Sequence, residues 1–297
     1  MRLLVTGAHG QLGRELIGVL GASAHHVVGV THPECDVASP ESIARIMERV
    51  RPDVVINCAA WSNVDAAEQH RDEAFAVNAT GPRLLALECA RRDALLCHIS
   101  TDYVFDGAAS SPYREDAAVH PLGVYGASKA AGEDEVRAVS PHHQIVRTAW
   151  LYGQEGPNFV LTMVRLARER GELRVVADQR GAPTWTGHLA PALARLVQLG
   201  ATGTFHLTNG GDTTWHGFAR AIVAAAGLTV PVVAITTDEY PTPAQRPPYA
   251  VLDNAAWRRL GNPPLPYWGD GLREYLRRRG LLSHGAADLD TDSGAAS

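Results

Sequence analysis

Short runs of β-branched and other apolar residues alternate with stretches of helical periodicity from residue 2 to about residue 150. This order predicts parallel strands joined by right-handed helical crossovers. The apolar density of the runs fits strands that helices bury on both faces. The sequence therefore predicts an α/β fold with a doubly wound parallel sheet. The expected strands are residues 2–6, 26–31, 54–58, 95–100 and 144–148.

The pattern changes after Trp150, where glycine and proline loops separate the helical stretches. Residues 151–282 are therefore expected to form mainly a smaller, substrate-binding lobe, with some return to the sheet. Its expected helices lie near residues 158–170, 187–199 and 215–226.

Two later segments lack a helical or strand pattern. Residues 240–249 are too rich in proline for a helix or a central strand and are expected to be an ordered loop or a lid. Residues 283–297 are small and acidic, so they bury too little apolar surface to order themselves. We expect this tail to be disordered and dispensable.

The composition argues against several partners and locations. Hydrophobic residues make up 45% of the chain, charged residues 20%, and the net charge is -5. Such a chain offers no basic surface for nucleic acid or for an anionic membrane. No apolar run reaches the roughly 18 residues of a membrane span, and the start lacks the apolar segment of a signal peptide. We expect a cytoplasmic protein.

The four cysteines, Cys35, Cys58, Cys89 and Cys97, have none of the short paired spacings of a zinc site. A reducing compartment also disfavours disulfides. They are expected to be small apolar fillers, and the sequence predicts no metal site from them.

A glycine loop follows the first strand directly and opens the first helix. In it, Gly7 would allow a tight turn, Gly10 would let the backbone approach a pyrophosphate, and Gly13 would let helix and strand pack closely. The helix N-terminus would face the phosphates with its free N–H groups. This context predicts a Rossmann-type dinucleotide-binding domain over residues 1–150. The spacing GxxGxxG is typical of extended short-chain dehydrogenases.

The choice between NAD and NADP depends on the end of the second strand, where an acidic residue would bind the ribose 2'-hydroxyl. Here that place reads Val30-Thr31-His32. The missing carboxylate removes a repulsion against a 2'-phosphate, although no arginine is present to bind one. Thr31 is expected to contact the cofactor, and the sequence favours NADPH while leaving NADH or dual use open.

Tyr125 and Lys129 are four residues apart, which places both on one face of a helix. A phenol with its ordinary pKa near 10 is a poor acid–base group unless a cation stabilises its anion. We expect Lys129 to lower the pKa of Tyr125. Ser100 and Thr101 follow a buried strand, at the edge of the sheet where ligands bind. A hydroxyl there, which we assign to Thr101, can polarise a carbonyl while Tyr125 delivers a proton.

These motifs, in their order and spacing, resemble the dTDP-4-dehydrorhamnose reductase family from about residue 3 to residue 275. The resembling stretches are residues 7–13, 57–65, 77–80, 100–106, 125–133, 147–152 and 178–184. The resemblance implies reduction of the C4 keto group of dTDP-4-dehydro-6-deoxy-L-mannose to dTDP-L-rhamnose with NADPH or NADH. One departure is Ala127-Ser128, where a bulkier pair such as Glu-Thr would be expected. It leaves the acid–base pair intact.

The resemblance also implies contacts for each part of the ligands. Gly10, Gln11 and Leu12 would line the pyrophosphate, and Asp36 and Val37 would line the adenine. The nicotinamide half of the cofactor would contact Ala60, Trp61 and Ser62, with Ile99, Tyr125 and Lys129 beside it. The substrate residues are Thr101, Asp102, Trp150 and Arg246. Arg246 and the loop 178–184 would contact the nucleotide and its diphosphate, since arginine binds phosphate in a fork.

Other functions on the same fold stay open at this point. An epimerase or dehydratase would keep its nicotinamide bound and regenerate it, whereas a regulatory subunit would bind the dinucleotide without turnover. Members of the family have also been linked to a magnesium-bridged homodimer. That site would need acidic residues such as Glu15, for which the sequence identifies no convincing partners.

Overall fold

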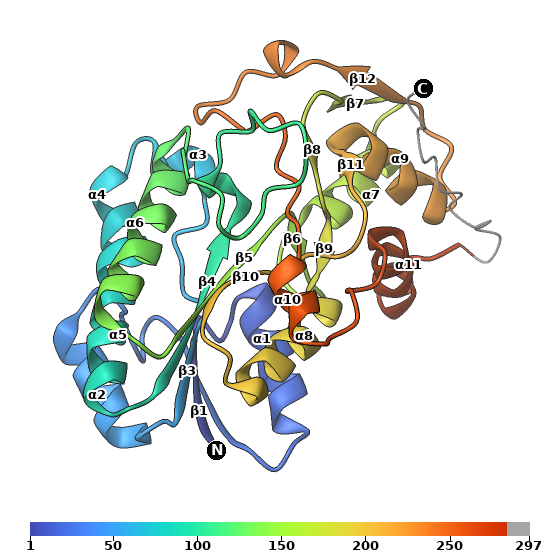
Figure 1. The fold of residues 1–297 in the computed structure, drawn as a ribbon. Coiled ribbons are helices and arrows are strands. Elements are labelled where there is room, and N and C mark those ends of the chain that lie inside the picture. The colour runs from blue at the N-terminus through green and yellow to red at the C-terminus, as the bar shows by residue number, and fades with distance from the viewer. Residues whose placement is uncertain (284–297) are drawn as a thin grey trace.

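The structure, a computed structural model, describes residues 1–283 and is built around a six-stranded parallel sheet in the order β10-β5-β4-β3-β1-β2 (Figure 1). The strands are β1 Arg2–Thr6, β2 His26–Val30, β3 Val54–Asn57, β4 Leu95–Thr101, β5 His143–Thr148 and β10 Gly203–His206. The five expected strands agree with these bounds to within one residue at either end. The predicted doubly wound sheet is confirmed.

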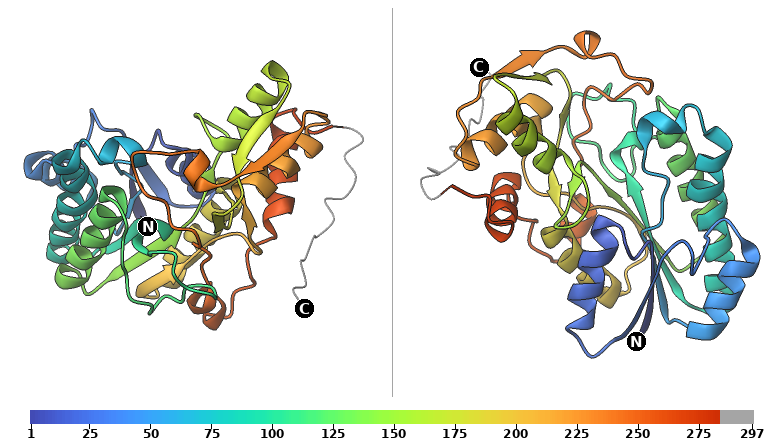
Figure 2. Two further views of the ribbon diagram at one scale, coloured as in Figure 1. Left: turned by 90° about the horizontal axis from the view of Figure 1, so that it is seen from above. Right: turned by 180° about the vertical axis from the view of Figure 1, so that it is seen from behind.

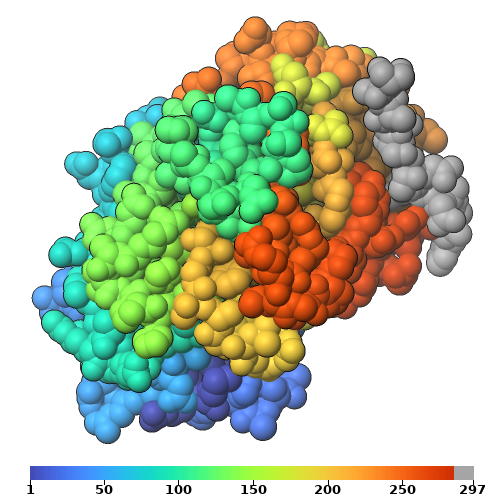
Figure 3. All heavy atoms as spheres, in the orientation of Figure 1, coloured from blue at the N-terminus to red at the C-terminus, as the bar shows by residue number. Residues whose placement is uncertain are grey.

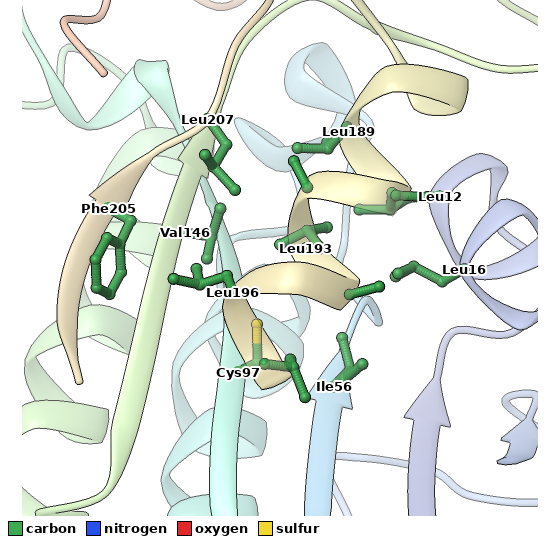
Figure 4. Close-up of a cluster of buried hydrophobic side chains, with 14 of the residues drawn as sticks. Leu12, Leu16, Ile56, Cys97, Val146, Leu189, Leu193, Leu196, Phe205 and Leu207 are labelled. Atoms are coloured by element: carbon green, nitrogen blue, oxygen red, sulfur yellow. The ribbon is translucent and has the colours of Figure 1, made fainter. Parts of the chain in front are cut away.

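Helices cover both faces of this sheet (Figure 1). The helices α2 Pro40–Val50, α5 Gly81–Arg91 and α6 Val124–Val139 lie on one face. The helices α1 Gln11–Gly21 and α8 Thr186–Leu199 lie on the other. Figure 4 shows leucines of α1 and α8 packed onto Ile56, Cys97 and Val146 of the sheet. Burial on both faces explains why these strands are apolar throughout.

The order of the strands fixes where a ligand can bind. β2 lies on one side of β1 and β3 on the other, so β1 and β3 are adjacent strands whose crossovers go opposite ways. The loops that follow such strands diverge and leave a crevice at the carboxyl edge of the sheet. The glycine loop that follows β1 is one wall of this crevice.

The smaller lobe has its own hydrophobic core, in which Tyr152, Trp185, Phe218 and Tyr275 are buried. Its elements are β6 Leu151–Tyr152, α7 Phe159–Glu169, β7 Leu173–Val176, β8 Arg180–Gly181, β9 Thr184–Trp185, β11 Thr213–Thr214, α9 Trp215–Ala225, β12 Val232–Ile235 and α11 Trp268–Arg278. The three expected helices are present as α7, α8 and α9. Figure 2 shows this lobe beside the helix-covered sheet from two further directions.

The chain crosses between the two parts more than once. After β9, α8 packs against α1 and β10 pairs with β5, so part of the segment after residue 150 belongs to the sheet layer. Farther along, Tyr113 and Leu252 form a β-bridge, and the segments around them lie side by side on one face of the molecule (Figure 3). The two parts therefore share a long boundary.

The short helices are α3 Val64–Ala67, α4 Arg71–Phe75 and α10 Ala255–Arg259. The segment 240–249 contains no helix and no strand beyond a bridge of Tyr249 to Arg180, as expected for an ordered loop. Ser283, the first residue of the expected tail, is ordered and donates its backbone N–H to Ala225 O. The rest of that tail lies outside the described residues. Within residues 1–283, no helix has the length and apolar character to cross a membrane.

Candidate active site

A cavity of about 1040 Å³ opens at the carboxyl edge of the sheet and reaches the smaller lobe. Its walls are the glycine loop after β1, the segments that follow β3 and β4, the first turns of α6, and residues around Trp150. The cavity lies at the switch point between β1 and β3, where the strand order predicts a ligand.

The glycine loop has the geometry that a pyrophosphate requires. Gly7 has φ +66°, and a Cβ there would lie 2.7 Å from the Ala59 nitrogen. A Cβ at Gly13 would lie 2.3 Å from Gly7 O, so helix α1 could not approach the loop as closely. Gly10 is the N-cap of α1 and provides no side-chain cap. The free N–H groups of the first helical turn therefore remain available to an anion, and these residues fit a dinucleotide.

Gln11 joins the glycine loop to the smaller lobe. Its Oε1 accepts a hydrogen bond from the Gly153 N–H at 2.6 Å, and its Nε2 donates to Pro157 O at 3.2 Å. Gln11, which is predicted to contact the pyrophosphate, thus already has both atoms of its side-chain amide hydrogen-bonded to the backbone of the smaller lobe.

At the adenine end, Asp36 and Val37 line the cavity as expected, whereas Thr31 does not. The backbone N–H and hydroxyl of Thr31 both donate to the Glu34 carboxylate, at 2.9 and 2.8 Å. These bonds lower the pKa of Glu34. A carboxylate therefore does stand at the end of the second strand, contrary to the expectation from the sequence, because Glu34 folds back onto Thr31.

Tyr125 and Lys129 lie one turn apart on α6, and both line the cavity. Burial raises the pKa of Tyr125 to about 12, although a hydrogen bond with Thr101 acts against this rise. Burial lowers the pKa of Lys129 to about 8, and its Nζ donates to Ile99 O at 2.6 Å. The expectation that Lys129 lowers the pKa of Tyr125 was wrong for this structure, since burial governs both groups.

Thr101 ends β4, and both Ser100 and Thr101 line the cavity. The Ser100 hydroxyl donates to the buried Glu133 carboxylate at 2.6 Å. The Thr101 hydroxyl donates to Asp102 Oδ1 at 2.9 Å. Asp102 Oδ2 is buried without a hydrogen-bond partner in the part of the chain that the structure describes. Burial raises the pKa of Asp102 to about 7. Near neutral pH this carboxyl can both donate and accept a hydrogen bond.

Trp150 enters the cavity from a strained turn. Its φ of 45° is left-handed, a conformation that costs a bulky residue free energy and that clusters at functional sites. A Cβ at Gly181 would lie 2.5 Å from the Trp150 ring, so the ring fits only against a glycine. Behind it, Trp215 at the start of α9 stacks on the indole and also lines the cavity.

Ser128 belongs to the Ala127-Ser128 pair, at which the sequence departs from the family pattern, and its hydroxyl connects α6 to a neighbouring segment. It is buried on α6, its hydroxyl donates to Tyr125 O at 2.8 Å, and it accepts from Asn78 Nδ2 at 3.0 Å. Asn78 in turn bonds both the N–H and the C=O of Trp61, at 2.9 and 3.0 Å. This network connects the acid–base helix to the segment predicted to hold the nicotinamide half.

Arg246 does not line the cavity. Its guanidinium forms two bonds to the Asp65 carboxylate, at 2.6 and 2.7 Å, and further bonds to Thr242 Oγ1 and Ala244 O. The loop 178–184 is likewise outside the lining, but its Gly181 supports Trp150. The predicted diphosphate contacts are thus not brought to the cavity with the other residues.

Most of the predicted residues do meet in the cavity. They are Gly7, Gly10, Gln11, Leu12, Gly13, Asp36, Val37, Ala60, Trp61, Ser62, Ile99, Thr101, Asp102, Tyr125, Lys129 and Trp150. Other lining residues, among them His32, Cys58 and Trp215, were given no role from the sequence, although Cys58 lies in the resembling stretch 57–65 and His32 follows Thr31. No group of three or more His, Cys, Asp or Glu side chains within residues 1–283 could hold a metal. Glu15 lies 3.9 Å from the Arg278 guanidinium.

The parallel sheet, the glycine loop at its switch point and the Tyr125–Lys129 pair define a class, the nicotinamide-dependent oxidoreductases of the extended short-chain dehydrogenase type. Within that class, residues 1–280 match the family described as the RmlD substrate binding domain, and the chain belongs to this family.

Known relatives agree with this assignment. The chain is 45% identical over 288 residues to a dTDP-4-dehydrorhamnose reductase of Burkholderia thailandensis, with 90% of this chain and 95% of the relative covered. It is 42% identical over 275 residues to a dTDP-4-keto-6-deoxy-D-glucose reductase of Streptomyces niveus, covering 92% and 96%. It is also similar to a solved dTDP-4-dehydrorhamnose reductase from Bacillus anthracis in complex with NADP. That similarity has a TM-score of 0.91 at 38% identity and covers 93% of this chain and 99% of the other.

Proposed function

We propose that this protein reduces the C4 keto group of dTDP-4-dehydro-6-deoxy-L-mannose to dTDP-L-rhamnose, with NADPH as the preferred reductant and NADH as an alternative. The observation that carries the proposal is the meeting of Thr101, Asp102, Tyr125 and Lys129 in one cavity with the glycine loop. The names of the relatives in Burkholderia and Bacillus support this substrate.

When bound, the nicotinamide supplies the hydride that adds to the keto carbon. The chain supplies the proton: Tyr125 gives its phenol proton to the oxygen that becomes the C4 hydroxyl. Its raised pKa keeps the phenol protonated before the reaction, as a general acid requires. Thr101 lies in the same cavity, and its hydroxyl, which donates to Asp102 in this structure, is proposed to turn and hold the same oxygen. Lys129 is proposed to bind the nicotinamide ribose.

The sugar would lie between the Trp150 indole and the carboxyl of Asp102. The indole would offer an apolar face to the sugar ring and its methyl group, and the Asp102 carboxyl, whose buried Oδ2 has no partner among the described residues, would turn toward a sugar hydroxyl. Arg246 is proposed to reach the nucleotide diphosphate after leaving Asp65.

A second candidate is the same reduction on another dTDP-4-keto-6-deoxyhexose, which the name of the Streptomyces relative favours. The two candidates share every group that handles the hydride and the proton. They differ in the configuration of the sugar at C3 and C5, and so in the positions of a hydroxyl and of the methyl group that the cavity must match.

The test mixes the purified protein with each keto sugar and NADPH or NADH, and follows the loss of reduced-nicotinamide absorbance. Tyr125→Phe should lower kcat by roughly 10²–10⁴-fold while cofactor binding is retained. The matched control is Tyr113→Phe, because the Tyr113 hydroxyl bonds Asp106 outside the cavity. Turnover of only the D-gluco sugar would favour the second candidate. Cofactor binding without consumption would favour an epimerase or a regulatory subunit.

We also propose a cytoplasmic enzyme that forms a homodimer and has no nucleic-acid partner. The free thiols Cys35, Cys58, Cys89 and Cys97 suit a reducing compartment. The family resemblance supports the dimer, and light scattering with and without magnesium tests it.

A further inference from the structure

Lys129 is the end of a buried chain of polar groups that begins beside the glycine loop. The Thr6 hydroxyl donates to Asn57 Oδ1 at 2.6 Å, and Asn57 Nδ2 lies 3.1 Å from His98 Nδ1. His98 Nε2 lies 3.5 Å from Lys129 Nζ. Asn57 and His98 are 0% exposed and Lys129 is 2% exposed, so bulk solvent does not reach these contacts.

One backbone group fixes the direction of every bond in this chain. The Ala59 N–H can only donate, and the Asn57 atom that faces it at 3.2 Å must therefore be the amide oxygen. The other amide atom, the nitrogen, then faces His98 Nδ1 and donates to it. A neutral imidazole that accepts at Nδ1 carries its hydrogen on Nε2. Burial keeps His98 neutral, because it holds the pKa of this imidazole well below its usual range.

The Nε2–H of His98 therefore points at the Lys129 nitrogen. An ammonium has no lone pair to accept this N–H, whereas a neutral amine can accept it and still donate to Ile99 O. A hydrogen bond to the neutral form of a group disfavours its charged form. Two other neighbours act the opposite way: Glu133 on α6 and Cys58 after β3 both raise the pKa of Lys129. His98 on β4 is the neighbour whose hydrogen faces the nitrogen.

We propose that His98 is a positioning residue for Lys129. Asn57 and the Ala59 N–H hold the His98 imidazole in the Nε2–H tautomer, and this N–H keeps Lys129 ready to lose its proton. The proposal deepens the proposed function, since Lys129 matters to turnover only if the Tyr125 site is catalytic. The same chain links the state of Lys129 to Thr6 and Ala59, the residues that border Gly7.

The chain itself makes a clean test possible, because Lys129 is its only lysine. Protein labelled with 15N and 13C lysine, without cofactor or substrate, gives one side-chain signal to titrate. In wild type the midpoint should lie well below that of free lysine. The proposal also requires that in protein labelled with 15N histidine as well, the His98 ring, identified by its contact to Lys129 side-chain protons, shows the 15N shifts of the Nε2–H tautomer. An Nδ1–H tautomer or an imidazolium in the wild type would overturn it.

Two variants separate the N–H from the bulk of the ring. His98→Asn keeps a polar atom near Nδ1 for Asn57 but removes the donor to Lys129, and should raise the Lys129 midpoint by about one pH unit. His98→Gln places an amide N–H near the position of Nε2 and should stay closer to wild type. An equal midpoint in wild type and His98→Asn would overturn the proposal. If His98→Asn does not fold, the tautomer measurement in wild type still decides.

Kinetics then distinguish this proposal from the proposed function. The pH profile of kcat should move in His98→Asn in the direction of the Lys129 midpoint, and His98→Gln should restore it. A purely structural role would lower activity at every pH alike and would count against the proposal. The NMR results stand even if neither keto sugar is turned over, since they involve no substrate.

Discussion

The indole of Trp150 lies flat on the indole of Trp215, with ring centroids 3.6 Å apart and 6° between the ring planes. The two residues come from different elements, the turn after β5 and the start of α9, and the Phe159 ring packs against Trp215 with ring centroids 4.6 Å apart. The position of the Trp150 ring in the cavity is therefore supported by Trp215, a residue of the smaller lobe.

Replacing Trp215 by Ala should remove that support and raise KM for the nucleotide sugar by roughly tenfold, since aromatic pairs contribute about 0.5–1.5 kcal/mol beyond their buried area. Trp215→Phe, which keeps a ring in place, should fall between wild type and Trp215→Ala. Steady-state kinetics with the keto sugar varied measure the effect. A rise in KM for NADPH alone would show that the stack serves the cofactor.

Gly181→Ala should also displace the Trp150 ring, because the added Cβ would lie 2.5 Å from that ring. We expect a loss of about 1–3 kcal/mol in the free energy of unfolding, as for other overpacked sites, together with weaker sugar binding. Gly171→Ala is the matched control, since a Cβ there meets nothing within 4 Å. Chemical denaturation compares the two, and equal stability would contradict the close packing.

Asp102 should make stability depend on pH. Its pKa is raised from 3.8 to about 7 in the folded protein, so the folded state binds a proton that the unfolded state has lost. The free energy of unfolding must then fall as pH rises from about 4 to about 7, by on the order of 4 kcal/mol from this group. Asp102→Asn should lack this component. Denaturation of both proteins at pH 4.5 and 8 measures the difference, and parallel pH profiles would disprove the raised pKa.

Glu34 should weaken the preference for NADPH. Its carboxylate is held at Thr31 by two hydrogen bonds, at the end of β2 where the ribose 2'-position is expected. Glu34→Gln removes a negative charge near the 2'-phosphate and should lower KM for NADPH several-fold at low salt, with little change for NADH. Glu41→Gln, on the exposed first turn of α2, is the control. Equal changes for both cofactors would place Glu34 away from the 2'-phosphate.

The sequence predicted the features that depend on neighbours along the chain. Strands buried on both faces are apolar throughout, so their bounds could be read to within one residue. The glycine loop and the Tyr125–Lys129 pair depend on local spacing and turned out to share one cavity. Their spacing could be recognised without knowledge of distant residues.

The errors concern contacts that no local pattern encodes. Arg246 pairs with Asp65, 181 residues away, so its free guanidinium could not be assumed. Glu34, three residues after Thr31, places a carboxylate at the end of β2 because its side chain folds back, and the contact of Thr31 with a cofactor stays a prediction. The pKa values of Tyr125 and Lys129 follow their burial, which depends on the assembled fold and not on their spacing.

The return of β10 to the sheet bears on how the chain is made. Arg147 of β5 and His206 of β10 contact each other although 59 residues separate them, and much of the smaller lobe is synthesised in between. Until His206 has left the ribosome, β5 is an open edge strand with unpaired backbone groups, the kind of edge that invites aggregation. Nascent chains that stall within this interval should therefore depend most on chaperones.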